Sequence, residues 1–99
     1  MEIKQSKDAG NLTVTVIGCL DTTTSPELMS VFEGGLDGVT ALTVDFTNLD
    51  YVSSAGFRVL LVAHKKMVAA GGTMTIKGVN PSVREVFDMT GFSDIFTIV

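Results

Sequence analysis

Three stretches of the chain alternate apolar and polar residues with a period of two, which is typical of β-strands with one buried face. They cover residues 12–17, 41–47 and 73–78. Each is rich in β-branched residues, which suit a pleated sheet. A turn at residues 9–11 precedes the first stretch, so we expect a hairpin whose other strand reaches back to Ile3.

Three other stretches carry apolar residues at the spacing of an α-helix. They run from Ser25 to about Gly38, from Ser54 to about Ala70 and from Asn80 to Gly91. Ser25 and Asn80 each precede a proline, which is typical of a helix start with the first residue as N-cap. The apolar stripes predict the buried faces: Leu28, Met29, Val31, Phe32 and Leu36 in the first helix, Phe57, Leu60, Leu61, His64, Met67 and Val68 in the second, and Val83, Val86, Phe87 and Met89 in the third.

The order of these elements predicts the fold class. The strands at 41–47 and 73–78 flank the longest helix, so they should be parallel neighbours in a βαβ unit. Residues 48–52 are predicted as a loop, and residues 95–99 as a short edge strand. The sequence therefore predicts an α/β fold with a small mixed, mainly parallel sheet of four to five strands and helices packed on one side. We expect a single domain spanning residues 1–99.

Charge and composition narrow the classes of function. The chain has 7 basic and 11 acidic residues, which argues against non-specific nucleic-acid binding. It carries no apolar run long enough to insert in a membrane and no apolar leader segment, so we expect a cytoplasmic protein. The only cysteine, Cys19, allows no internal disulfide and is expected in the core near a strand end. No pattern typical of a cofactor or metal site is present.

The sequence "SSAG" at residues 53–56 contains the two adjacent hydroxyl groups that are the best candidates for a functional site. It lies after the loop expected at residues 48–52, where the longest helix should begin, so its hydroxyls should sit at a helix N-terminus. Unpaired N–H groups and a partial positive charge make such a position tolerant of an anion. Ser53 or Ser54 could be only an N-cap, or one of the two hydroxyls could receive a phosphoryl group.

Three segments together resemble the STAS domains of anti-sigma factor antagonists. They are "GCLDTTTSPEL", "LDYVSSAGFRVLL" and "AAGGTMTIKGVNPSVREVFDMTGFSDIF", and their order and spacing match nearly the whole chain. The resemblance implies a non-catalytic regulator that binds an anti-sigma factor, often a serine kinase, and so frees a sigma factor. Phosphorylation of the antagonist by the kinase would release the complex, and a protein phosphatase would reset it.

The resemblance also assigns residues. The family's phosphorylated serine lies two residues before the glycine, which maps to Ser54, with Ser53 as second choice. The chain departs from the best-studied members at Ser53, where Asp is common, and at Ala55, where Ser or Thr is usual. We expect Phe57 and Arg58 on the outer side of the helix start. The expected partner surface is Asp21, Thr22, Tyr51, Ser53, Ser54, Phe57 and Arg58.

Two alternatives stay open. A STAS adaptor, for example in a lipid-transport ATPase complex, would bind its partner constitutively without phosphorylation. An enzyme with a serine nucleophile is disfavoured, because the only histidine, His64, lies ten residues along the helix from Ser54, about 15 Å away. We therefore expect no enzymatic activity, and a monomer or weak dimer in solution.

Overall fold

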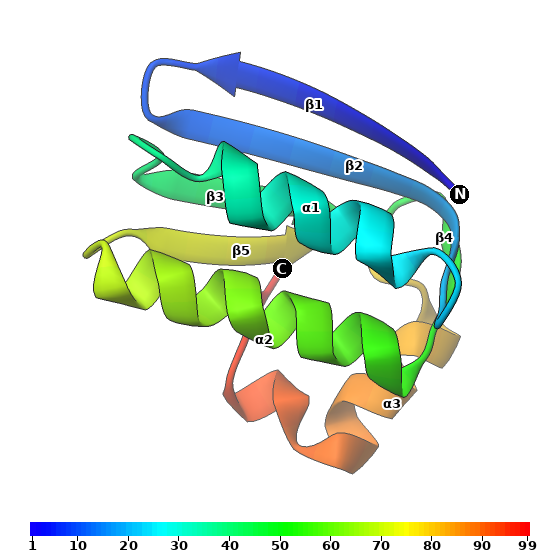
Figure 1. The fold of residues 1–99 in the computed structure, drawn as a ribbon. Helices are drawn as coiled ribbons and strands as arrows, with labels where there is room; N and C mark the ends of the chain where they lie inside the picture. The colour runs from blue at the N-terminus through cyan, green and yellow to red at the C-terminus, as the bar shows by residue number, and fades with distance from the viewer.

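A computed structural model describes residues 1–99 as six β-strands, three α-helices and one short 3₁₀-helix, η1 (Figure 1). In chain order the elements are β1 (Glu2–Asp8), β2 (Asn11–Leu20), α1 (Ser25–Gly35), β3 (Ala41–Asp45), β4 (Leu49–Val52), α2 (Ser54–Ala69), β5 (Thr73–Lys77), α3 (Pro81–Thr90), η1 (Phe92–Asp94) and β6 (Thr97–Ile98).

The strands form one mixed sheet in the order β1-β2-β3-β5-β6, with β4 paired to β2 outside this path. The hairpin of β1 and β2 is antiparallel and reaches back to Ile3, as the sequence predicts, and Ile3 lies opposite Val16. All other pairings are parallel, including β3 with β5. The predicted fold class and the parallel β3–α2–β5 unit are confirmed, and the sixth strand comes from a segment predicted as a loop.

That segment is β4, and the prediction of a loop over residues 48–52 is wrong. Three of its four residues, Leu49, Tyr51 and Val52, pair with the end of β2, where Leu20 lies opposite Val52. The register shifts between Gly18 and Cys19, and Gly18 has a positive φ of 101°. This irregularity lets β2 leave β3 and continue along β4, so that one long strand serves two neighbours.

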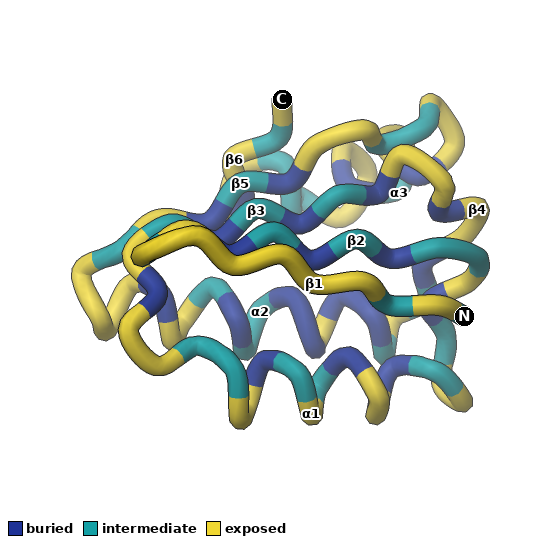
Figure 2. Tube along the Cα trace, turned by 90° about the horizontal axis from the view of Figure 1, so that it is seen from above, coloured by how far each residue is buried: buried dark blue, intermediate teal, exposed yellow.

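The helices α1 and α2 lie side by side on the same face of the sheet, as Figure 2 shows. Alternate residues of β2 and β3, including Val14 and Val44, are buried beneath them. The helix α3 instead contacts η1 and β4, at one end of the sheet. One cluster of 22 buried apolar residues joins all these layers.

Some details of the helices differ from the prediction. Ser25 is not an N-cap but the first residue of α1, only 5% exposed, and Thr24 takes the cap position. The helix ends at Gly35, before Gly38. Val68 and Met89 are 62% and 79% exposed, so their assignment to buried stripes is wrong. The buried face of α2 runs through Gly56, Phe57, Val59, Leu60, Ala63 and Met67.

Cys19 is exposed, which contradicts the expectation that it lies in the core. The buried residues of β2 occupy even positions, from Leu12 to Leu20. Because successive side chains of a strand point to opposite faces, an odd-numbered residue belongs on the other face. The position of Cys19 in the strand therefore outweighs the general tendency of cysteine to be buried.

Candidate functional site

The junction between β4 and α2 is tied to the end of β2. Val52 ends β4, Ser53 follows, and α2 begins at Ser54. The Ser53 N–H donates to the carbonyl oxygen of Leu20 at 2.8 Å, and the Ser53 carbonyl accepts from the Phe57 N–H at 3.1 Å. Strand pairing and helix start thus meet at Ser53, which fixes the direction in which α2 leaves the sheet.

The two serine hydroxyls have different surroundings. Ser53 is the N-cap of α2, and its half-buried side chain accepts from the Gly56 N–H at 3.4 Å. Ser54 is the first helical residue, is exposed, and makes no side-chain hydrogen bond. Ser53 therefore has a structural task of its own, whereas the hydroxyl of Ser54 is free.

Gly56 brings the first turn of α2 close to the sheet. A Cβ atom at this position would lie 2.8 Å from Leu20 Cγ and 2.9 Å from Val52 Cγ1, inside the limit of ordinary contacts. Only glycine allows the helix to start at this distance from β2 and β4. The first turn of α2 therefore lies closer to the sheet than any other residue at position 56 would permit.

The loop from β2 to α1 is organised by Asp21, which lies one residue past Leu20 and so beside the start of α2. One carboxylate oxygen, Oδ1, accepts from the Thr23 hydroxyl at 2.7 Å and the Thr23 N–H at 2.9 Å. It also accepts from the Thr24 N–H at 3.1 Å. These bonds hold the pKa of Asp21 below its ordinary value, and the bond from the Thr23 hydroxyl contributes most to this shift. The carboxylate therefore shapes the loop, while Thr22 next to it is exposed.

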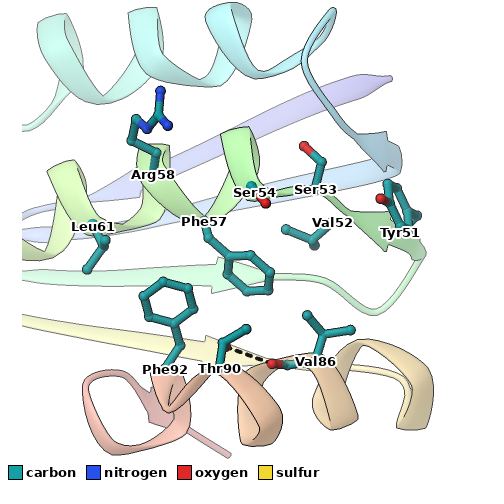
Figure 3. A pocket seen from close by; sticks show the side chains of 10 residues that line it. All are labelled: Tyr51, Val52, Ser53, Ser54, Phe57, Arg58, Leu61, Val86, Thr90 and Phe92. Carbon is teal, nitrogen blue, oxygen red and sulfur yellow. Dashed lines mark hydrogen bonds between the residues drawn. The ribbon is translucent and has the colours of Figure 1, made fainter.

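A groove of about 420 Å³ opens between the first half of α2 and the helix α3 (Figure 3). It brings together five of the predicted partner-surface residues, but neither Asp21 nor Thr22. Sequence reasoning missed the opposite wall, which α3 and η1 supply through Val86, Thr90 and Phe92. Ten residues line the groove: Tyr51, Val52, Ser53, Ser54, Phe57, Arg58, Leu61, Val86, Thr90 and Phe92.

Phe57 and Arg58 differ sharply in exposure. Phe57 is only 4% exposed, which confirms its place in the predicted apolar stripe, whereas its expected place on the outer side of α2 is wrong. Its ring stacks on Phe92 and meets Phe87 edge-on, with centroid distances of 4.9 Å in both cases. Arg58 is exposed, as expected, and takes part in none of the three ion pairs of the chain. Phe57 thus joins α2 to α3, and Arg58 presents a free charge.

His64, which lies on the predicted apolar stripe, is half-buried, and its ring meets Phe96 edge-on at 5.6 Å. It lies in the second half of α2, whereas Ser54 is the first residue of that helix. No three His, Cys, Asp or Glu side chains come together as a group that could hold a metal ion. None of the helices combines the length and apolar character that crossing a bilayer requires.

Comparison with known proteins places this geometry in a family. The family model of the STAS domain matches residues 1–99. BtrV of Bordetella bronchiseptica, named as a candidate anti-sigma factor antagonist, is 31% identical over 99 residues, which cover 99% of this chain and 85% of BtrV.

Two solved structures share the fold. An anti-sigma factor antagonist from Mycobacterium paratuberculosis has a TM-score of 0.86 at 22% identity, covering 98% of this chain and 83% of that one. The phosphorylated form of the Bacillus cell fate determinant SpoIIAA has a TM-score of 0.78 at 17% identity, covering 99% and 91%. The resemblance seen in the sequence motifs is therefore confirmed: the chain belongs to the STAS domain family.

Proposed function

We propose that this protein is an anti-sigma factor antagonist, a non-catalytic regulator that binds an anti-sigma factor and is released when Ser54 is phosphorylated. The observation that carries the proposal is the free, exposed hydroxyl of Ser54 beside the structural cap Ser53. The names of the relatives support the class of function, since BtrV is named as a candidate anti-sigma factor antagonist and the Mycobacterium paratuberculosis structure is described as one.

The switch would act through charge at the binding surface. A phosphoryl group adds about −1.5 to −2 charges at pH 7. The fold can accept this dianion, because Ser54 is exposed at a helix N-terminus and the first turn of α2 contains no acidic residue. A partner surface that fits the unmodified serine would have to desolvate the dianion. A penalty of roughly 3 kcal/mol weakens the complex more than 100-fold.

The proposed partner surface surrounds Ser54. Tyr51, Ser53 and Arg58 present side chains at the rim of the groove, and Asp21 and Thr22 extend the surface along the neighbouring loop. Phe57 contributes from below the rim, because its ring is buried against α3 and η1. An exposed aromatic residue such as Tyr51, which is 54% exposed, is a suitable anchor for a protein interface.

The partners that this function requires are a serine kinase, which would be the anti-sigma factor itself, and a protein phosphatase that removes the phosphate. Through them the protein would control transcription by a sigma factor in the cytoplasm, without contacting nucleic acid. We propose that residues 1–99 act as one domain around their common core, as a monomer or weak dimer.

The test begins with the protein purified from its native cells. Intact-mass measurement and site mapping should find a phosphate, about 80 Da, on Ser54 in a fraction of the molecules. Affinity capture with Ser54→Ala should then retain the anti-sigma factor, and capture with Ser54→Asp should lose it.

Ser82→Asp is the matched control. Ser82 is exposed in the first turn of α3, so the variant adds the same charge at another helix start. It should capture the partner as the unmodified protein does. A protein that stays unmodified during growth and stress, and whose Ser54→Asp variant still binds, would contradict the switch and favour a constitutive adaptor.

A further inference from the structure

Arg58 is the one charged residue that lines the groove beside Ser54. The remaining basic residues of the chain lie elsewhere, and three of them are already paired: Lys4 with Glu2, Lys77 with Asp45, and Arg84 with Asp88.

Arg58 also lines a second hollow between α1 and α2, next to Ser25 and Met29. Figure 3 shows its guanidinium on the α1 side of α2, away from the Ser54 hydroxyl. Its side chain is therefore exposed and without an anionic partner.

Ser54 and Arg58 are separated by one turn of the same helix. Residues four apart on a helix are neighbours on its surface, about 5–6 Å between their Cβ atoms. An anion that precedes a cation at this spacing is the more favourable order. A phosphate on Ser54 would also suit the helix dipole, because Ser54 is the first residue of α2. The unmodified serine offers Arg58 no negative charge, but a phosphoserine would.

We infer that Arg58 forms an ion pair with the phosphate when Ser54 is phosphorylated, and is thereby withdrawn from the partner surface. This inference rests on the proposed phosphorylation of Ser54 and adds a second component to the switch. The modification would introduce a dianion and at the same time engage the only cation of the groove. In the unmodified protein, the same guanidinium is free to bind a carboxylate of the partner, with the bidentate geometry that arginine favours.

The pair can be measured without the partner or the kinase. Phosphoserine is installed at position 54 during translation, and its ionisation is followed by phosphorus NMR between pH 7.5 and 4.5. The second pKa of phosphoserine is about 6, and a neighbouring guanidinium favours the dianion. We expect the pKa in the wild-type background to lie about 0.3 below that in Arg58→Gln, from the strength of helical ion pairs.

Matched variants separate the pair from the rest of the helix. Lys65→Gln removes an exposed cation from the second half of α2 and should leave the phosphate pKa at the wild-type value. Arg58→Lys keeps the charge and should retain part of the shift. Because Arg58 is exposed, its variants should fold, which the melting temperature checks.

Equal phosphate pKa values in the wild type and Arg58→Gln would overturn the inference. That result would leave the proposed phosphorylation standing, because it says nothing of whether native cells modify Ser54. Conversely, an unmodified Ser54 in native cells would count against the proposed function, while the NMR titration would still report whether the ion pair forms.

Discussion

Asp21 and Thr24 exchange hydrogen bonds across the turn that leads into α1. The Asp21 N–H donates to Thr24 Oγ1 at 2.8 Å, and the Thr24 N–H donates to Asp21 Oδ1 at 3.1 Å. The Thr24 hydroxyl also donates to the Cys19 carbonyl at 2.8 Å. The loop beside the candidate phosphorylation site is therefore held by a closed set of bonds in which the ionised Asp21 carboxylate is the main acceptor.

The stability of the protein should depend on the ionisation of Asp21. Its hydrogen bonds favour the carboxylate and lower its pKa below 3.8, so this contribution is present above about pH 4 and is lost as the pH falls through the folded-state pKa. Asp21→Asn should melt at a lower temperature than the wild type at pH 7, and the difference should shrink on acidification. Thermal melts followed by circular dichroism from pH 7 to pH 2.5 measure this.

Asp50→Asn is the control for that experiment, because Asp50 is exposed and takes part in no side-chain hydrogen bond or ion pair. Its melting temperature should follow that of the wild type throughout. If the difference in melting temperature between Asp21→Asn and the wild type stays constant down to pH 2.5, the charge of Asp21 does not contribute to the stability of the protein.

Two glycine substitutions should have opposite effects. Gly56→Ala places a methyl group 2.8 Å from Leu20 Cγ and should destabilise the protein by about 1–3 kcal/mol. Gly34→Ala lies in α1, where nothing outside the helix's own backbone comes within 4 Å of the new Cβ, and should stabilise the protein by about 0.5–1 kcal/mol. Urea denaturation of both variants gives the free energies of unfolding. Similar free energies of unfolding for Gly56→Ala and Gly34→Ala would refute the close packing of α2 on β2 and β4.

The two neighbouring serines should separate in their effects on stability. Ser53→Ala removes the N-cap of α2 and should cost about 0.5–2 kcal/mol of unfolding free energy. Ser54→Ala removes an exposed hydroxyl without a hydrogen bond, so its effect should stay within about 0.5 kcal/mol. Parallel chemical denaturation curves measure both. If Ser54→Ala proves the more damaging change, the assignment of the cap is wrong.

Tyr51 and Phe57 should differ in what their loss impairs. Tyr51→Ala should leave the unfolding free energy nearly unchanged, because the ring is 54% exposed, but should weaken partner binding by about tenfold or more. Phe57→Ala should cost about 3–5 kcal/mol of stability, because its ring is buried against Phe87 and Phe92. Denaturation curves together with titration of the captured anti-sigma factor test this pair. Unimpaired binding by a folded Tyr51→Ala would remove Tyr51 from the partner surface.

Most of the fold could be predicted because its strands and helices have regular patterns. In the strands β2, β3 and β5 buried residues alternate with more exposed ones, and α1 and α3 each begin with a proline in the first turn. The strand β4 could not be recognised this way. Its four residues are buried only at the two ends, so they show no alternation, and its partner is the end of β2 beyond an irregularity.

The candidate site was predicted in part. The motif located the helix start and the glycine, and it singled out Ser53 and Ser54. The sequence could not tell which hydroxyl serves as the cap, because that depends on the dihedral angles of one residue. The far wall of the groove, with Val86 and Phe92, comes from α3 and η1, about thirty residues further along the chain. Its approach to α2 is a tertiary contact without a local signature.

The long strand β2 has a consequence for the speed of association. Its first half is bonded to β3, its end to β4, and its last carbonyl to Ser53, so the Asp21 loop and the start of α2 are held in fixed relation. A surface that is already in place needs no rearrangement before docking. The observed association rate should therefore rise in proportion to partner concentration without reaching a plateau, with a rate constant of about 10⁵–10⁷ M⁻¹s⁻¹.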